Sequence, residues 1–383
     1  MPRFPSSSHT IGAMKGSVYN ALAHRLASHE GEVYPFHIGD TWMEPAPGCR
    51  MEDLSEAEHP GMHRYSGVQG RPGLLDACVD HLRARTGLAE ERANVLVTAG
   101  ATGGLTALMG AVVDPGDEVL ILAPFWPLIA GAVRTYRGTP VPVPVVGDVD
   151  TAAGLLERLQ AALTGQTVAL YLNTPNNPTG RLLPRSWVEA MVDFARAHDL
   201  WLISDEVYDG YVYEGEHVYA RPLAPERTVS AYSFSKAYGM AGNRAGFLAG
   251  PASLIAEVVK VSTHTVYNAP TASQITAERA LRGGADAWLA NARSQYAAAG
   301  RAAASRLGVA SPQGSTFLWL DIAEQLGEGG MGAFLERCVD HGLFCAPGDS
   351  FGPYPTHLRV CFTATPPEVT ARGIDVLAGL LGR

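Results

Sequence analysis

The strongest constraint on the fold is a regular alternation of short apolar runs and amphipathic segments in the middle of the chain. The apolar runs predict strands at 94–98, 118–123, 140–145, 168–173, 201–205, 229–234 and 246–249. Several of these runs are apolar at every position, which is typical of strands covered on both faces. The segments 102–112, 151–163 and 184–198 lie between them and carry apolar residues at the three-to-four spacing of a helix. This alternation predicts an α/β domain with a mainly parallel sheet.

The C-terminal part of the chain has a different pattern, which predicts a second, smaller α+β domain. An Ala-rich helix is expected at 285–307, broken near Gly300, followed by a helix at 331–341 and a closing helix from Pro366. Strands are expected at 316–321, 343–346 and 357–362. In the first part, the alternating Pro-Val-Pro-Val-Pro run at 140–144 predicts an edge strand, because proline cannot donate to an interior ladder.

Composition narrows the class of protein. Apolar residues make up 46% and charged residues 17% of the 383 positions, which permits a large core and argues against disorder. The net charge of −9 argues against a nucleic-acid or anionic-membrane partner. The cysteines at 49, 78, 338, 345 and 361 show neither a CxxC pair nor metal spacing, so we expect thiols of a reducing compartment and no metal.

Two segments bear on the location of the protein. The N-terminal residues 1–14 lack the continuous apolar core of a signal peptide. The charge-free stretch 95–113 has the length of a membrane span, but its threonines and glycines indicate strand, loop and helix instead. We therefore expect a cytoplasmic protein.

Lys236 is the first candidate for chemistry, because lysine is scarce and this one lies among small residues. The other lysines are Lys15 and Lys260. Lys236 directly follows an apolar run in Ser233-Phe-Ser-Lys-Ala-Tyr-Gly, and Arg244 comes shortly after it. An amine that condenses with an aldehyde needs a fixed position and a depressed pKa, and the serines and arginine could bind a phosphate. Taken alone, the pattern also fits a solvated surface lysine.

Asp205 ends the run Trp-Leu-Ile-Ser-Asp and is a candidate ligand-binding carboxylate. Ligands of open α/β sheets bind at the carboxyl ends of parallel strands. A carboxylate that met a pyridinium there would keep the ring nitrogen protonated, because an opposite charge favours the charged form. The protonated ring would act as an electron sink. Glu206 should face the other way on an extended strand. The alternative is a helix-capping aspartate.

Three further segments lie at the ends of predicted strands. Asn177 lies in Asn-Thr-Pro-Asn-Asn-Pro-Thr-Gly, where prolines and a glycine fix the loop and leave a rigid amide. Gly100-Ala-Thr-Gly-Gly opens a helix whose free N–H groups can hold a phosphate, although neither a dinucleotide glycine pattern nor a P-loop lysine is present. Trp126 could stack on a flat cofactor. The plainer alternatives are a turn for the Asn177 segment and packing for Trp126, but the common position of the three segments at strand ends favours a single site.

With these residues in place, the sequence resembles the class I and II aminotransferases of pyridoxal-phosphate (PLP) fold type I, from about Gly39 to Phe362. The most specific matches are Ser-Phe-Ser-Lys-x-x-Gly-x-x-Gly-x-Arg-x-Gly at 233–246 and Asn-x-Pro-x-Asn-Pro-Thr-Gly at 173–180. Supporting matches are Asp-Glu-Val-Tyr at 205–208, Gly-Ala-Thr at 100–102 and Ala-Pro-Gly-Asp-Ser-Phe-Gly at 346–352, with Leu-Arg-Val at 358–360.

This resemblance implies the architecture. It predicts a large α/β domain at 43–270, whose mainly parallel seven-stranded sheet is sandwiched by helices. It predicts a smaller α+β domain formed by residues 1–42 and 271–383.

The resemblance also implies that PLP is the cofactor and gives roles to the residues around it. Lys236 would hold PLP as a Schiff base and later move the substrate proton. Asp205 would pair with the pyridine nitrogen, and Tyr208 would complete the catalytic set by hydrogen-bonding the phenolic oxygen. The remaining contacts to the phenolic oxygen, ring and phosphate are assigned to Asn177, Trp126, Ala101, Thr102, Ser233, Ser235 and Arg244.

For the substrate, the resemblance assigns the grip on the α-carboxylate to Arg359, with Gly39 and Asn177 as further contacts. Clamping that carboxylate would hold the Cα–H bond perpendicular to the cofactor ring, so that Lys236 removes a proton in preference to loss of CO₂. Tyr65 would reach the phosphate bound by the neighbouring subunit, which implies a homodimer with sites at the interface.

Two segments depart from the family pattern near the substrate side chain. His264 falls where aminotransferases of acidic substrates often carry an arginine, unless this segment aligns differently. Around the substrate glycine, Asp40, Trp42 and Glu44 could line the substrate entrance. These departures reduce support for aspartate or glutamate and favour a basic, polar or aromatic amino acid.

We therefore expect a PLP-dependent aminotransferase that moves the amino group of an L-amino acid to a keto acid. The alternatives on the same scaffold are a β-elimination or replacement lyase, a cyclase of a hydroxylated basic amino acid, and a decarboxylase, which Arg359 disfavours. A non-catalytic sensor is a further alternative, but no helix-turn-helix segment is visible before the PLP region.

Overall fold

The computed structural model describes residues 6–12, 14, 16, 25, 29–147 and 149–383. Within them, seven strands form the larger sheet in the order β1-β7-β6-β5-β4-β2-β3. These strands are β1 (Val95–Thr98), β2 (Glu118–Ala123), β3 (Thr139–Pro144), β4 (Thr167–Asn173), β5 (Trp201–Asp205), β6 (Thr228–Ser233) and β7 (Gly246–Ala249). Strands β2 to β6 pair in parallel, and β7 runs antiparallel to both β1 and β6. The predicted mainly parallel seven-stranded sheet is confirmed.

Every strand of this sheet lies within one residue of its predicted position, and β3 is an edge strand as its prolines require. The charge-free stretch 95–113 forms β1 followed by a helix. In the part of the chain that the structure describes, no helix is long and apolar enough to cross a bilayer.

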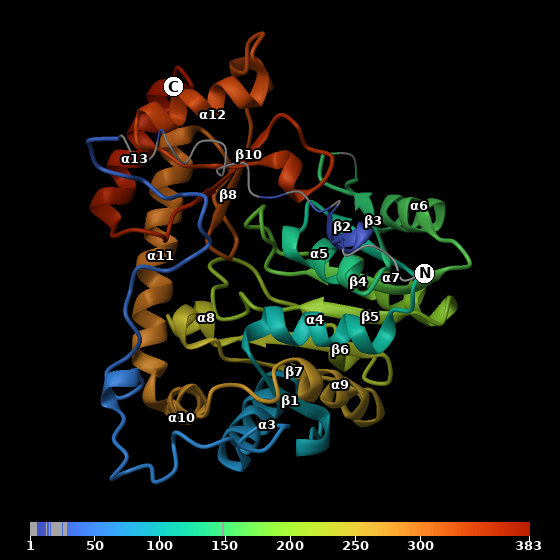
Figure 1. The fold of residues 1–383 in the computed structure, drawn as a ribbon. Coiled ribbons are helices and arrows are strands. Elements are labelled where there is room, and N and C mark those ends of the chain that lie inside the picture. The colour runs from blue at the N-terminus through green and yellow to red at the C-terminus, as the bar shows by residue number, and fades with distance from the viewer. Residues whose placement is uncertain (1–5, 13, 15, 17–24, 26–28, 148) are drawn as a thin grey trace.

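Helices cover both faces of the large sheet (Figure 1). On one face lie α4 (Gly100–Val112), α5 (Pro127–Thr135) and α9 (Ala252–Thr265), which share a core with alternate residues of the strands. The opposite face is covered by α6 (Ala152–Ala162) and α7 (Arg185–Ala197) at one end and by α3 (Pro72–Thr86) and α10 (Thr271–Arg279) at the other. Thr151 is the N-cap of α6, and its side chain accepts a hydrogen bond from Gly154 N at 3.1 Å.

The second sheet is smaller and antiparallel, in the order β8-β10-β9. It consists of β8 (Phe317–Asp321), β9 (Ala346–Pro347) and β10 (His357–Cys361), and packs with α11 (Asp286–Leu307), α12 (Gly330–Asp340) and α13 (Pro367–Leu380). Tyr34 and Phe36, far away in sequence, are buried in the same core. Helix α11 runs along the side of the molecule and connects this region to α10 (Figure 1).

Two expectations for the C-terminal part are wrong. Helix α11 is continuous through Gly300. The glycine lies at a close contact, because a Cβ there would be 2.9 Å from Phe362 Cζ. The strand expected at 343–346 is reduced to Ala346–Pro347, and Leu343 forms only an isolated parallel bridge with Tyr34.

The remaining elements are short. They are α1 (His9–Gly12), α8 (Phe234–Ala237), the π-helical η6 (Ala280–Gly284) and the 3-10 turns η2 (Met51–Asp53), η3 (Arg92–Asn94), η4 (Arg221–Leu223), η5 (Ala241–Asn243), η7 (Ala323–Gln325) and η8 (Gly348–Phe351). The domain boundaries at 42/43 and 270/271 stay a prediction, and much of the segment 1–28, including Lys15, lies outside the described residues.

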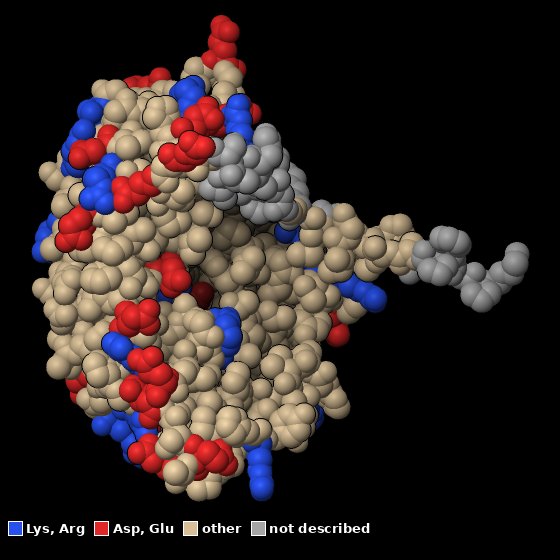
Figure 2. Space-filling view, turned by 60° about the vertical axis from the view of Figure 1, so that its left-hand side comes forward, with Lys and Arg blue, Asp and Glu red and all other residues tan. Residues whose placement is uncertain are grey.

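All five cysteines lie in the described part of the chain, and each is a buried free thiol. A cytoplasmic location stays a prediction. On the face drawn in Figure 2, acidic and basic side chains are interspersed, and the surface is hollowed near the middle of the molecule.

Candidate active site

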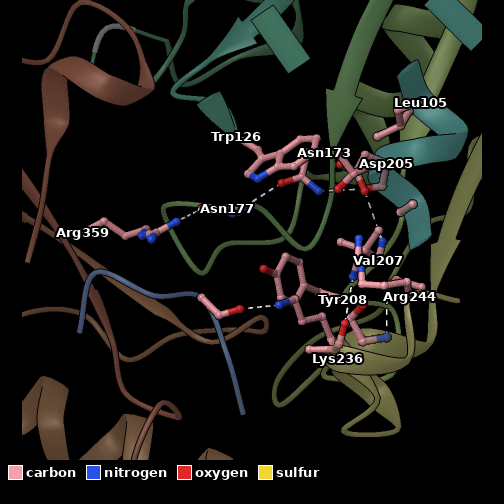
Figure 3. A pocket seen from close by; sticks show the side chains of 16 residues that line it. Leu105, Trp126, Asn173, Asn177, Asp205, Val207, Tyr208, Lys236, Arg244 and Arg359 are labelled. Carbon is pink, nitrogen blue, oxygen red and sulfur yellow. Dashed lines mark hydrogen bonds between the residues drawn. The ribbon is translucent and has the colours of Figure 1, made fainter. Parts of the chain in front are cut away.

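A cavity of about 240 Å³ lies at the carboxyl ends of the parallel strands (Figure 3). It is lined by Gly39, Ala101, Thr102, Leu105, Trp126, Asn173, Asn177, Asp205, Val207, Tyr208, Ser233, Ser235, Lys236, Ala241, Arg244 and Arg359. The structure thus brings together all the predicted site residues except Tyr65. They converge because β4, β5 and β6 are parallel neighbours whose ends meet at one edge of the sheet.

Lys236 lies in the single turn α8, directly after β6. The turn begins at Ser233, whose hydroxyl accepts a hydrogen bond from Ser235 N at 3.0 Å. The Lys236 Nζ donates to the main-chain oxygen of Gly39. Burial lowers the pKa of this amine, and the nearby Asp40 carboxylate opposes that effect. A buried amine with a depressed pKa is favoured as a nucleophile towards an aldehyde.

Asp205 is buried at the end of β5 and faces the cavity. Its Oδ2 accepts a hydrogen bond from Tyr171 OH at 2.6 Å, and its Oδ1 accepts one from Val207 N at 3.4 Å. Burial raises the pKa of Asp205 to about 6, although the Tyr171 hydrogen bond lowers it. A cation in the cavity would stabilise the ionised carboxylate.

Glu206 faces the opposite side of the sheet, as the strand alternation predicts. Its carboxylate accepts hydrogen bonds from Ser204 Oγ and Tyr232 OH, both at 2.8 Å. It is fully buried, which the sequence pattern does not predict.

A candidate site for an anion lies where the start of α4 meets β7. A Cβ at Gly246 would lie 2.7 Å from Ala101 N, so only glycine lets the two main chains approach this closely. Gly100 has a φ of 72°, and a Cβ there would lie 2.6 Å from Arg244 Nη2. The free N–H groups of the first turn of α4 and the Arg244 guanidinium therefore face the same place, which suits a phosphate.

The opposite end of the cavity carries a second arginine. Arg359 on β10 donates from Nη1 to Asn177 Oδ1 at 3.0 Å and from Nη2 to the main-chain oxygen of His37. Its guanidinium lies 4.3 Å from the ring centroid of Phe317 and 4.8 Å from that of Phe351. The fork is thus held in a fixed orientation, which suits a carboxylate.

Two residues that support the site were not predicted to have a role. Asn173 accepts a hydrogen bond from Asn177 N at 2.6 Å and donates to the main-chain oxygen of Asp205 at 2.8 Å, so it braces both residues. It begins the matched 173–180 motif, which is the signal that could have identified it. Tyr171 lies inside an apolar run, and nothing in its spacing separates it from a core residue.

The predicted cofactor contact Tyr65 and the residues predicted to set specificity do not line the cavity of this chain. Tyr65 is 83% exposed, and its ring centroid lies 4.9 Å from that of Tyr267. His264 is exposed in the last turn of α9. Asp40 is half-buried beside Gly39 and influences the Lys236 amine, whereas Trp42 packs against the core of the smaller sheet and Glu44 is exposed. The cofactor contact of Tyr65 and the specificity roles of the other residues stay predictions.

Comparisons with known proteins agree with this geometry. The model of the family described as "Aminotransferase class I and II" matches residues 39–377. The aspartate/prephenate aminotransferase of Thermus thermophilus is 31% identical over 386 residues, which cover 98% of this chain and 99% of that protein. The arginine–pyruvate transaminase of Pseudomonas aeruginosa is 32% identical, with coverage of 95% and 94%. The structure of Thermus thermophilus aspartate aminotransferase with maleate matches with a TM-score of 0.89 at 28% identity, covering 98% of this chain and 100% of that chain.

Proposed function

Because the chain belongs to the class I and II aminotransferases, we propose that it moves the amino group of an L-amino acid to a keto acid with PLP held by Lys236. Amino-group transfer is the activity of the family. The cofactor, the roles of the individual residues and the substrate class form the proposal.

The donor set of the cavity fits PLP. The observation that carries the proposal is a buried amine of lowered pKa, Lys236, in one cavity with a buried carboxylate of raised pKa, Asp205. An aldehyde fits the first group, and a pyridine nitrogen that takes up a proton fits the second. The start of α4 with Arg244 suits the phosphate, and Trp126 offers a flat ring beside the cavity.

When bound, PLP supplies the delocalised system that stabilises a carbanion at the substrate Cα. The chain supplies the proton transfer. Lys236 is buried next to Gly39, and burial lowers the pKa of its amine, which favours the neutral form that can accept a proton. Asp205, when ionised, holds a positive charge at the ring nitrogen.

Arg359 orients the substrate. Its guanidinium is already fixed by Asn177, His37 and two phenyl rings, so gripping a carboxylate requires little reorganisation. A carboxylate held there and an amine held near Lys236 leave the Cα–H bond as the one presented to the base.

The cavity favours a substrate with a neutral or basic side chain over an acidic one. The cations among its described lining residues are Lys236, Arg244 and Arg359, and each already has a role. The Asp40 carboxylate lies near the Lys236 amine and adds a negative charge on that side. The relatives are named for aspartate and prephenate in one case and for arginine and pyruvate in another, so the family admits both charges.

The position of Tyr65 supports a homodimer. This tyrosine is exposed on its own subunit, where its phenol would be available to the phosphate of a neighbouring site. We expect analytical ultracentrifugation to show a dimer for the wild-type protein and for Tyr65→Phe. We expect Tyr65→Phe to bind PLP more weakly than the wild type.

Absorbance spectra of the PLP-loaded protein with single amino acids test the proposed reaction. Transamination converts the aldehyde form of the cofactor to its amine form, with one keto acid released per site. Ammonia release with an unchanged cofactor spectrum would instead indicate elimination and refute the proposal. A panel of acidic, basic, aromatic and aliphatic amino acids, scored by initial rate, identifies the substrate class.

A further inference from the structure

We propose that Tyr171 is a positioning residue for the cofactor, whose phenol holds one oxygen of Asp205 so that the other is presented to the cofactor's ring nitrogen. This inference rests on the proposed function. Tyr171 does not line the cavity and therefore acts through Asp205 alone.

The register of the sheet places the two side chains on the same face. Tyr171 lies in the middle of β4 opposite Ile203, and Asn173 lies opposite Asp205. Because side chains alternate along a strand, Tyr171 and Asp205 both point towards the face that carries α4. The phenol oxygen reaches Asp205 Oδ2 at 2.6 Å.

The two carboxylate oxygens of Asp205 accept hydrogen bonds of different length. Among the described residues, Oδ2 accepts the short hydrogen bond from Tyr171 OH, whereas the donor to Oδ1 is Val207 N at the longer distance of 3.4 Å. A carboxylate oxygen can accept more than one hydrogen bond, so Oδ1 retains capacity for a donor from the cavity. Asn173 fixes the main chain of Asp205 but does not contact its carboxylate.

The surroundings of Tyr171 argue that its hydroxyl serves Asp205 and not packing. The ring is fully buried in an apolar cluster that includes Ile121, Ile203 and Ala231. A phenylalanine would fill the same space, and a buried hydroxyl is costly unless it is hydrogen-bonded. The other ionisable groups around this pair are Glu206, which faces the opposite side of the sheet, and Tyr208. The side chain that donates a hydrogen bond to the Asp205 carboxylate is Tyr171.

The chain offers a matched control. Tyr232 on β6 is buried and donates at 2.8 Å to Glu206, the neighbouring carboxylate that points away from the cavity. Tyr232→Phe and Tyr171→Phe therefore remove the same group, from similar burial, from two adjacent carboxylates. A general loss of stability would lower the performance of both variants. A loss of cofactor positioning would appear in Tyr171→Phe and not in Tyr232→Phe.

The test measures PLP-loaded wild-type protein and both variants by three readouts. These are the PLP dissociation constant, kcat, and the pH midpoint of the cofactor's absorbance. A hydrogen bond to a charged group corresponds to roughly a 10- to 100-fold effect, so Tyr171→Phe is expected to weaken PLP binding or lower kcat by that factor. Its absorbance midpoint should move to higher pH, because a less firmly charged ring nitrogen opposes protonation of the conjugated Lys236 nitrogen less. Tyr232→Phe should leave the midpoint unchanged.

Two further measurements separate positioning from structure. In an Asp205→Asn background, Tyr171→Phe should have no additional effect on the midpoint, because the partner it holds is no longer ionised. A PLP analogue with carbon in place of the ring nitrogen should bind wild type and Tyr171→Phe equally. An additional loss in the Asp205→Asn background, or equal effects of Tyr171→Phe and Tyr232→Phe, would overturn the inference.

Failure of this inference is distinguishable from failure of the proposed function. If the wild-type protein does not bind PLP covalently, the proposed function fails. If it does and Tyr171→Phe behaves like wild type, only the role of Tyr171 fails. Should Tyr171→Phe not fold, 3-fluorotyrosine at position 171 keeps the shape and strengthens the donor, and the midpoint should then move to lower pH. An unchanged midpoint would count against the inference.

Discussion

Arg359 Nη1 donates to the side-chain oxygen of Asn177 at 3.0 Å, and this contact connects β10 of the smaller sheet to the loop after β4 of the larger one. The proposed substrate site therefore takes residues from two separate sheets. The rings of Phe317 and Phe351 hold the same guanidinium from the smaller sheet's side. Such pre-orientation lowers the cost of ordering the carboxylate fork when a substrate binds.

Replacing this arginine by lysine keeps the charge but removes the two-pronged geometry. We expect Arg359→Lys to raise KM for every α-amino acid by about 10-fold or more, with a smaller effect on kcat, because the lost contact is to the common carboxylate. Arg359→Ala should raise KM further. Steady-state kinetics with three amino acids of different side chain measure this, and Arg301→Lys on the exposed face of α11 is the control. An effect confined to one amino acid would contradict the assignment.

Asp205 should make the stability of the cofactor-free protein depend on pH. Its pKa is raised from 3.8 to about 6 by burial, so the folded state binds the proton more tightly than the unfolded state does. The stability from this group is fully present below pH 3.8 and is lost as pH rises through about 6. A difference of roughly two pKa units corresponds to at most about 3 kcal/mol. Asp205→Asn should therefore stabilise the cofactor-free protein at pH 8 but not near pH 4, as measured by urea unfolding. Equal effects at both pH values would contradict this.

Glu90 and Arg221 form a buried ion pair that anchors the loop before β6. Both side chains are 3% exposed, and Arg221 Nη2 donates to Glu90 Oε2 at 2.9 Å. Removing one partner leaves a buried charge without its counterion, so Glu90→Gln should lower the free energy of unfolding by about 3–5 kcal/mol. The exposed pair of Asp76 and Arg92 provides the control, and Asp76→Asn should cost less than about 1 kcal/mol. Similar costs for the two variants, measured by urea unfolding, would argue against a burial effect.

Gly246 should be essential for the phosphate end of the site. A Cβ there would meet Ala101 N and Tyr232 O, both at 2.7 Å, so Gly246→Ala must push β7 away from the start of α4. We expect PLP affinity to fall by about 10-fold or more, because the N–H groups that face the phosphate move with α4. Gly242→Ala, where a Cβ would have no neighbour within 4 Å, should bind PLP like wild type. Fluorescence titration with PLP compares the two variants, and equal affinities would refute the close-approach argument.

Residues in distinctive local sequences could be predicted from the sequence, and residues defined by long-range packing could not. Lys236, Asp205 and Asn177 each follow an apolar run in a polar or glycine-rich context, and parallel strands bring such positions to one edge. The bounds of the strands in the large sheet were also predictable, because β-rich runs end at recognisable turns.

The unpredicted features depend on contacts between distant segments. Tyr171 has the sequence context of a core residue, and only the register of β4 against β5 reveals its bond to Asp205. The sequence of α11 suggests a break at Gly300, and only the structure shows that a Cβ there would lie 2.9 Å from the ring of Phe362, which follows β10. Tyr34 and Phe36 join the core of the smaller sheet although they precede it by most of the chain. Periodicity within one segment contains no information on such partners.

The central claim is that Lys236 binds PLP covalently through its side-chain amine. The most direct test is to incubate the purified protein with PLP, reduce it with borohydride, and locate the adduct by peptide mass spectrometry. We predict one adduct per chain, on the peptide that contains Lys236, and none in a Lys236→Ala variant. An adduct on Lys15 or Lys260 instead, or none at all, would contradict the account.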